Sequence, residues 1–232
     1  MGYSRKDEIA KLKRERKEAK AAKKRNENVR ERLVRFLIVC EGTKTEPFYF
    51  EALIKNHFST VREVTIEGEG MSTTALVDET MKIKKDLERK NAMTFDRVWV
   101  VFDKDDFGDF NEAIEKARKF GFQSAWTNEA FELWYYLHFE YLDTGIGRAE
   151  YIDKLQKAFR NRMGDENFKY EKRNPEIYKL LQQYGKEDLA KRFAERLRSL
   201  FAGTNYATHK PCTMIDKLVD ELENPQLLLK KK

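Results

Sequence analysis

Short apolar runs alternate with longer stretches of helical periodicity over the middle of this chain. The runs are rich in β-branched and aromatic residues and have the length of strands, which predicts strands at residues 35–40, 61–66, 97–102 and 122–126. After each run, apolar residues recur at helical spacing, which predicts helices that begin at Thr45 and cover about 72–90, 110–120 and 130–139. Strand and helix therefore alternate throughout this region.

This alternation predicts an α/β fold with a mostly parallel sheet flanked by helices. The first and third runs are apolar without a polar alternation, which is typical of strands buried on both faces. Beyond Gly147 the periodicity is helical only, at residues 149–159, 174–184, 187–201 and 214–222. We therefore expect three parts: an arm (1–34), an α/β core (35–146) and a helical C-terminal extension (147–232) that packs on the core.

Composition supports a globular fold and excludes several classes of protein. The 232 residues are 41% hydrophobic and 12% aromatic, which is enough for a sizeable core and incompatible with full disorder. No stretch approaches the roughly 18 apolar residues of a membrane span. The N-terminus is highly charged and does not resemble a secretory signal. We expect a cytoplasmic protein without a membrane partner.

The positive charge is concentrated at the N-terminus. Residues 1–35 contain 14 Lys and Arg against 6 Asp and Glu, whereas the whole chain has a net charge of only +6. The remainder is therefore close to neutral. The segment from Ser4 to Asn28 predicts a solvated, partly helical arm. This arm either contacts the phosphates of nucleic acid or acts as a solubilising or assembly tail, and both interpretations stay open.

The cysteines and histidines argue against zinc. Cys40 and Cys212 are too few for a disulfide framework or a Cys-rich zinc site. His57, His138 and His209 lie far apart in the sequence and form no HExxH motif. A metal ion would therefore need oxygen ligands, which favours Mg²⁺, Mn²⁺ or Ca²⁺.

Acidic residues follow two of the predicted strands. Glu41 directly follows the first strand, with Glu46 at the start of the next helix. Asp103 and Asp105 follow the third strand. Ligands of open parallel α/β sheets bind at the carboxyl ends of the strands, and four carboxylates gathered there repel one another unless cations compensate them. The pattern predicts a divalent-cation site, although Asp after a strand is also common in turns and helix caps.

Four segments resemble motifs of the RloB-like family. They are residues 39–50 (VCEGTKTEPFYF), 100–105 (VVFDKD), 127–134 (TNEAFELW) and 210–213 (KPCT). A Glu after one strand and Asp-x-Asp after another are also similar to the Toprim domain of topoisomerases, primases and OLD-type nucleases. The resemblance covers about residues 35–222. It departs from the family pattern at Glu129, where proline is expected after Asn128.

The resemblance implies a Toprim-like fold and a nuclease that hydrolyses phosphodiester bonds of DNA or RNA with Mg²⁺ or Mn²⁺. On this analogy Glu41, Asp103 and Asp105 are catalytic metal ligands. Glu46 is a second-metal or outer-shell ligand, and Glu132 is either a further ligand or a buried structural glutamate. Such genes are associated with bacterial restriction and phage-defence (abortive infection) loci, often beside an ATPase. The expected partners are therefore nucleic acid and an ATPase.

Basic and hydroxyl groups complete the hypothetical site. Phosphodiester hydrolysis requires negative charge to be neutralised on the phosphate and on the leaving oxygen, which two divalent ions can do. Thr43, Lys44 and Thr45 lie at a predicted helix start, where they are candidates for binding a phosphate. Lys44 or Lys210 is the candidate for stabilising the charge of the transition state, and we count Lys210 among the catalytic residues.

Two other functions use the same features differently. Nucleotidyl transfer of the primase type would use the same carboxylates together with a nucleotide site that the sequence does not display. A non-catalytic module with this fold would bind nucleic acid or recruit a partner. The presence of Glu41, Asp103 and Asp105 favours an enzyme. Self-association into a homo-oligomer is compatible with the sequence.

Overall fold

The computed structural model describes residues 13–18, 33–56, 62–68, 73–104 and 108–229. The chain divides into two units, residues 1–33 and 34–232. In the first unit, residues 13–18 are helical and exposed, with an ion pair between Arg14 and Glu18. The rest of the basic arm lies outside the described residues. The sheet and the helices around it belong to the second unit.

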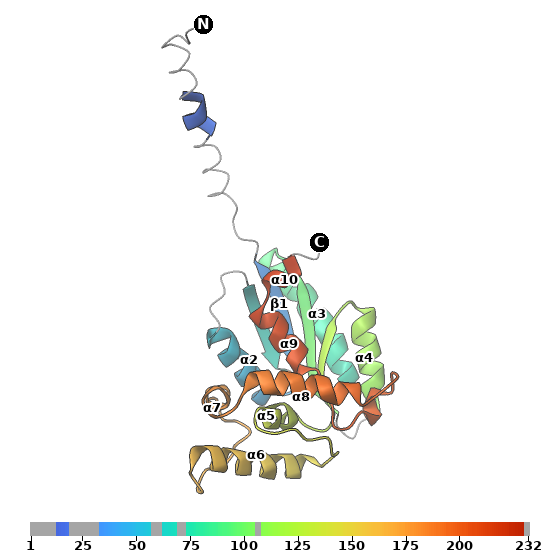
Figure 1. The fold of residues 1–232 in the computed structure, drawn as a ribbon. Helices are drawn as coiled ribbons and strands as arrows, with labels where there is room; N and C mark the ends of the chain where they lie inside the picture. The colour runs from blue at the N-terminus through green and yellow to red at the C-terminus, as the bar shows by residue number, and fades with distance from the viewer. Residues whose placement is uncertain (1–12, 19–32, 57–61, 69–72, 105–107, 230–232) are drawn as a thin grey trace. The chain divides into compact units, whose positions relative to one another are not determined.

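Four parallel strands form the sheet of the described residues (Figure 1). In order across the sheet they are β2 (Arg62–Gly68), β1 (Val34–Cys40), β3 (Arg97–Asp103) and β4 (Gln123–Thr127). Ile38 of β1 pairs with Ile66 on one side and with Trp99 on the other. The predicted strands are confirmed to within two residues at each boundary. The predicted α/β fold is confirmed as well, and it is consistent with a Toprim-like architecture.

Helices cover both faces of this sheet. Phe36 and Ile38 of β1 pack in a core shared with α2, α5 (Glu132–Leu137) and α9, whereas Leu37 and Val39 pack in a second core with α3 and α4. Figure 1 shows α3 and α4 on one face and α9 on the other. The helices are α2 (Thr45–Asn56), α3 (Thr73–Asn91), α4 (Phe110–Lys119) and α9 (Ile215–Glu223). Burial on both faces explains why β1 and β3 lack polar alternation.

The strand order creates a switch point between β1 and β3. The chain passes from β1 to β2 on one side and then returns to form β3 on the other side of β1. The carboxyl ends of β1 and β3 are therefore followed by connections that leave in opposite directions. Open α/β sheets bind their ligands at this position.

Helices α5 (Glu132–Leu137), α6 (Arg148–Met163), α7 (Ile177–Tyr184) and α8 (Glu187–Ser199) gather at the end of the sheet where the strands finish (Figure 1). A 3₁₀ turn η1 (Tyr206–Thr208) follows α8, whereas α10 (Gln226–Leu229), after α9, lies at the opposite end of the sheet beside β1. The predicted C-terminal helices are all present, although α6 runs four residues longer than predicted and α7 begins three residues later. This helical part therefore covers the strand ends.

A C-terminal segment is added beside the end of β4. Thr127 and Thr213 form an antiparallel bridge, and their hydroxyl groups lie 3.0 Å apart. The backbone N–H of Asn128 donates to the carbonyl of Cys212 at 2.9 Å, and that of Met214 donates to the carbonyl of Trp126 at 2.8 Å. These contacts bring residues just before Cys212 to the same sheet edge as the acidic residues.

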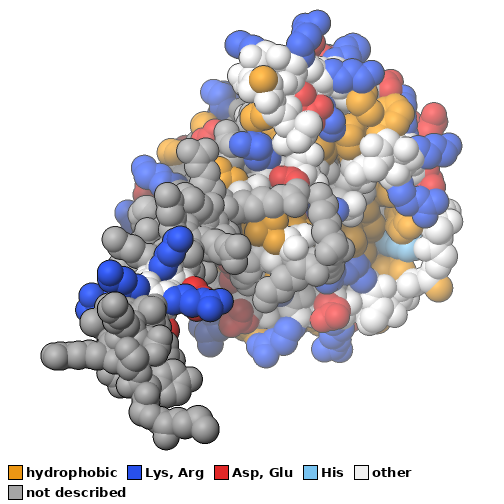
Figure 2. All heavy atoms as spheres, turned by 90° about the horizontal axis from the view of Figure 1, so that it is seen from above, with side chains coloured by type: hydrophobic (Ala, Val, Ile, Leu, Met, Phe, Trp, Pro, Cys, Tyr) orange, Lys and Arg blue, Asp and Glu red, His pale blue; other side chains and the backbone are white. Residues whose placement is uncertain are grey.

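The surface carries charges of both signs. Figure 2 shows one face, on which Lys and Arg side chains are spread among acidic and apolar ones rather than gathered in one patch. This agrees with the nearly neutral composition beyond residue 35. Among the described residues, no helix has both the length and the apolar character needed to cross a membrane.

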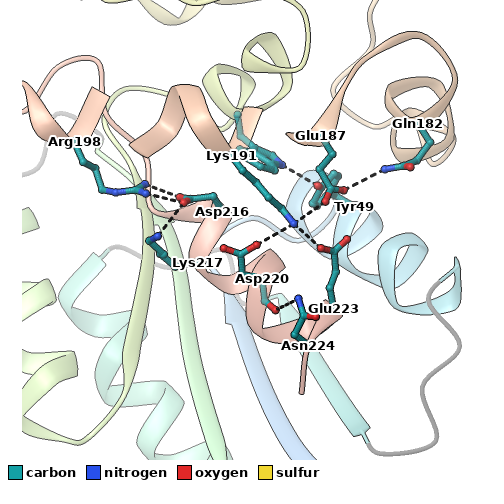
Figure 3. A network of polar contacts seen from close by, with 11 residues as sticks. Tyr49, Gln182, Glu187, Lys191, Arg198, Asp216, Lys217, Asp220, Glu223 and Asn224 are labelled. Atoms are coloured by element: carbon teal, nitrogen blue, oxygen red, sulfur yellow. Dashed lines mark hydrogen bonds and ion pairs between the residues drawn. The ribbon is translucent and has the colours of Figure 1, made fainter. Parts of the chain in front are cut away.

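Ion pairs fasten α8 to α9 (Figure 3). Lys191 lies 3.0 Å from Glu187 on its own helix and 2.9 Å from Asp220 on α9. Further along α8, Arg198 donates to both carboxylate oxygens of Asp216, at 2.6 and 2.7 Å, and to the carbonyl of Thr213. Asp216 is buried. The Arg198 pair therefore links α8 to the segment that lies along β4.

Replacing Asp216 with alanine should destabilise the fold, because Arg198 then loses the carboxylate that compensates it in a mostly buried position. We expect the free energy of unfolding to fall by about 3 kcal/mol, the size of effect seen when one partner of a buried ion pair is removed. Urea unfolding followed by circular dichroism measures the change. The exposed Glu195→Ala on the same helix is the control and should stay within about 0.5 kcal/mol of the parent. Equal losses in both variants would contradict the interpretation.

Candidate active site

The ends of β1 and β3 bring Glu41 and Asp103 into contact. The backbone N–H of Glu41 donates to the carbonyl of Val101 at 2.8 Å, which extends the pairing of the two strands by one residue. Oε2 of Glu41 then accepts a hydrogen bond from the backbone N–H of Asp103 at 3.1 Å. Two acidic residues that are 62 positions apart in the chain therefore lie side by side at the switch point.

The Asp103 side chain faces the segment that leads into α5. Its Oδ2 accepts a hydrogen bond from the backbone N–H of Phe131 at 3.0 Å and lies 3.8 Å from Nη2 of Arg148. The side chain is only 13% exposed. Asp103 thus connects the end of β3 to both α5 and the start of α6.

Glu46, in the first turn of α2, lies directly against Gly42. A Cβ atom at Gly42 would come within 2.0 Å of Oε2 of Glu46, so a residue with a side chain cannot occupy this position unless Glu46 moves. Oε2 is buried and has no hydrogen-bond partner among the described residues. A buried polar atom without a partner is unfavourable, and a bound cation is one way to satisfy it.

Glu132, the first residue of α5, is buried as well. Its Oε1 accepts a hydrogen bond from the Tyr170 hydroxyl at 3.2 Å and lies 3.8 Å from Nζ of Lys172. Tyr170 and Lys172 belong to the connection between α6 and α7. Glu132 therefore has a structural partner, yet its charge also acts on the other carboxylates.

Burial and neighbouring negative charges raise the pKa of Asp103 and of Glu46. Burial raises the pKa of Asp103 well above its usual range, and the charges of Glu46 and Glu132 raise it further, while Arg148 opposes the shift. Burial also raises the pKa of Glu46; the charge of Glu132 adds to this, and Arg148 and Lys172 oppose it. The raised pKa values arise because three acidic groups lie close together with little solvent around them, and because two cations compensate their negative charge only in part.

The predicted phosphate-binding residues surround the start of α2. Thr43 and Lys44 are exposed. The Thr45 hydroxyl donates to the backbone carbonyl of Lys172 at 2.9 Å, so it joins the first motif to the α6–α7 connection. Asp105 lies outside the described residues, and its role as a ligand stays a prediction.

Lys210 reaches the site through Glu129. Its ammonium group forms an ion pair with the Glu129 carboxylate at 2.5 Å, and the Glu129 carbonyl accepts a hydrogen bond from Nη2 of Arg148 at 3.0 Å. Glu129 has a φ of 89°, which is uncommon for a residue with a side chain and inaccessible to proline. This backbone turn explains why α5 begins at Glu132 instead of the predicted residue 130.

The arrangement suits a divalent cation in charge and in ligand type. Carboxylate oxygens are the donors that Mg²⁺ and Mn²⁺ prefer, and Glu46 contributes a buried oxygen without a hydrogen-bond partner in the described part of the chain. Among the described residues, which omit Asp105, no three His, Cys, Asp or Glu side chains already form a group of metal ligands. Glu41, Glu46 and Asp103 are the residues of this site that could hold an ion of this kind.

Residues 36–222 match the model of a protein family described as RloB-like protein. The chain belongs to the RloB-like family. The matched range includes Glu41, Asp103 and Lys210 and leaves out the basic arm. Comparison of this RloB-like protein with curated proteins and with solved structures finds no match.

Three functional candidates of this RloB-like protein have no sequence motif. They are Arg148, Tyr170 and Lys172, which contact the buried carboxylates from the helical C-terminal part. Arg148 did carry a signal, because it is the first residue of α6 and a positive charge there opposes the helix dipole. A positive charge that is unfavourable for its own helix indicates an interaction partner elsewhere in the fold. Tyr170 and Lys172 lie in a connection without periodicity, where no comparable signal exists.

The raised pKa of Glu46 predicts how stability depends on pH. In the folded protein this carboxyl keeps a proton that the unfolded chain has already released, so stability falls as the pH rises from the ordinary glutamate pKa through the raised value. Glu46→Gln removes the buried charge. We expect the variant to unfold like the parent at acid pH and to be more stable by about 1 kcal/mol at mildly alkaline pH.

Urea unfolding at several pH values, without divalent ions, tests this expectation. Glu51→Gln on the exposed side of α2 is the matched control and should follow the parent at every pH. A Glu46→Gln protein that is less stable than the parent at alkaline pH would show that the carboxylate is satisfied in the fold.

Proposed function

We propose that this protein is a divalent-metal-dependent nuclease that hydrolyses phosphodiester bonds of DNA or RNA. The observation that carries the proposal is the contact between Glu41 and Asp103 at the switch point of the sheet, beside the buried Glu46 and Glu132. These side chains come from the ends of two strands and the starts of two helices. This concentration of buried negative charge would repel a polyanionic substrate unless cations compensated it. Carboxylates whose charge is compensated by metal ions are the arrangement that metal-assisted phosphoryl chemistry requires.

Glu41, Glu46 and Asp103 would hold Mg²⁺ or Mn²⁺, with Asp105 as the further predicted ligand. The bound ion would neutralise charge on the phosphate and lower the pKa of a water molecule. Phe131 orients Asp103, because its backbone N–H occupies Oδ2 of that carboxylate. In this scheme Glu132, which Tyr170 holds, supports the site through its charge.

The chain's own basic and hydroxyl groups would bind and orient the substrate. Thr43 and Lys44 are exposed at the N-terminal end of the 12-residue helix α2, where the helix dipole favours a phosphate. Lys210 is held at the sheet edge by Glu129. We assign to Lys210 the stabilisation of charge on the transition state, once a phosphate competes with Glu129 for its ammonium group.

The chain belongs to the RloB-like family, and on this basis we extend the proposal to a cellular role. We place the nuclease in bacterial phage defence in the cytoplasm, where an ATPase partner would control it. The chain beyond residue 35 is nearly neutral in composition, so recognition of nucleic acid would depend on the site itself and on the basic arm.

Incubation with plasmid DNA, single-stranded DNA and total RNA, with and without Mn²⁺, tests the nuclease directly. We expect cleavage that needs Mn²⁺ or Mg²⁺ and stops in EDTA. Asp103→Asn and Glu41→Gln should each lower the rate by at least about a hundredfold, because each removes an electrostatic element of the reaction. Asp143→Asn, an exposed change, is the control. Cleavage that persists in EDTA or in both site variants would reject the proposal.

Deletion of residues 1–30 tests the arm. This segment contains most of the excess positive charge of the chain, so its removal should weaken nucleic-acid binding and flatten the dependence of the binding constant on salt. Fluorescence anisotropy over a range of salt concentrations measures both quantities. A salt slope equal to that of the full chain would instead support the solubilising or assembly tail.

A further inference from the structure

Two basic side chains of the helical C-terminal part lie against the buried carboxylates. Nη2 of Arg148 is 3.8 Å from Oδ2 of Asp103, and Nζ of Lys172 is 3.8 Å from Oε1 of Glu132. Both distances are longer than a hydrogen bond and short enough for a strong charge interaction. Each of these cations therefore lies within charge-interaction range of a carboxylate.

The basic side chains and the acidic side chains of these pairs differ in their exposure to solvent. The side chains of Arg148 and Lys172 are 41% and 43% exposed, whereas those of Asp103 and Glu132 are 13% and 4% exposed. The positive ends can thus meet a molecule that arrives from solvent, while the negative ends are covered. An approaching phosphate would encounter the cations before the carboxylates.

Hydrogen bonds with backbone carbonyls hold the Arg148 guanidinium and the main chain of Lys172. The Glu129 carbonyl accepts a hydrogen bond from Nη2 of Arg148 at 3.0 Å, which fixes one edge of the guanidinium beside the strained turn. The carbonyl of Lys172 accepts the Thr45 hydroxyl at 2.9 Å, which ties Lys172 to the residue next to Lys44. Lys172 and the exposed start of α2 therefore belong to one neighbourhood.

Lys210 differs from these two cations. Its ammonium group forms a close ion pair with Glu129 at 2.5 Å, and an added Cβ at Gly145 would come within 2.9 Å of its side chain. Lys210 is thus confined and already paired at short range. Arg148 and Lys172 lie 3.8 Å from the carboxylates of Asp103 and Glu132 and keep 41% and 43% of their side chains exposed, so a phosphate that arrives from solvent can contact them.

We propose that Arg148 and Lys172 are substrate-positioning residues that bind phosphates of the nucleic-acid backbone at the site, which rests on the nuclease activity proposed above. A divalent ion held by Asp103 would compete with Arg148 for Oδ2 of that carboxylate and would repel Lys172 beside Glu132. Arg148 and Lys172 then turn to the phosphate, to which arginine can donate two parallel hydrogen bonds and lysine a point charge. The helical C-terminal part thereby becomes part of the active site.

The test compares Arg148→Met and Lys172→Met with matched controls that remove the same charge nearby. Lys154→Met lies on the exposed side of α6, and Lys169→Met is exposed in the same connection as Lys172. Fluorescence anisotropy with short single-stranded DNA and RNA in Ca²⁺ measures binding over a range of salt. Titration calorimetry with Mn²⁺ alone measures the metal site independently of catalysis.

Each site variant should bind the oligonucleotides about tenfold more weakly than its control, with a salt slope lowered by roughly 1. Affinity for Mn²⁺ should stay equal to that of the parent or rise, because a competing charge has been removed. Arg148→Lys, which keeps the charge, should restore the salt slope. A purely structural role predicts the opposite pattern, in which Mn²⁺ affinity and thermal stability fall together and the salt slope is unchanged, and this result would overturn the inference.

Different results would reject the proposed nuclease activity and the positioning role of Arg148 and Lys172. If the parent protein binds Mn²⁺ and cleaves nucleic acid but both site variants bind oligonucleotides like their controls, only the role of Arg148 and Lys172 is rejected. If the parent neither binds Mn²⁺ nor cleaves any substrate, the proposed nuclease is rejected, and with it the positioning role.

Discussion

The parallel pairing of β1 with β3 is the interaction on which the candidate site depends. Because parallel strands end at the same edge, a residue that follows β1 and a residue that ends β3 must lie close together. The backbone N–H of Asp103 binds the Glu41 carboxylate directly, so the pairing also sets the orientation of one acid relative to the other. The strand order makes this edge the switch point of the sheet, where the two connections diverge and where open α/β sheets bind their ligands.

Burial then raises the pKa of two of the acidic residues, Glu46 and Asp103. Helices α5 to α8 cover the strand ends, where Glu46 and Glu132 are buried and the Asp103 side chain is only 13% exposed. The raised pKa values of Glu46 and Asp103 show that ionising both groups in this position is unfavourable. A fold that buries several carboxylates together needs positive charge beside them, and Arg148 and Lys172 provide part of it. The helical part is therefore coupled electrostatically to the sheet as well as packed on it.

A short turn at Glu129 links several of these elements. Its positive φ directs the backbone so that the Phe131 N–H meets Asp103 while the Glu129 carbonyl meets Arg148. The Glu129 side chain at the same time holds Lys210, which the segment beside β4 brings from near the C-terminus. Residues in sparsely populated backbone regions persist only where their surroundings fix them, and such residues are concentrated at functional sites.

The sequence by itself determined the elements and the chemistry of the strand ends. The apolar runs at 35–40 and 97–102, and the acids that follow them, are local properties, so they could be recognised without any contact map. Only the tertiary structure decided which basic residues face those acids. The Thr45 hydroxyl binds the carbonyl of Lys172, 127 positions away, and no periodicity or motif encodes such a contact. Charge compensation in a buried site depends on distances of a few ångströms between distant parts of the chain, and these distances are fixed only when the helices pack.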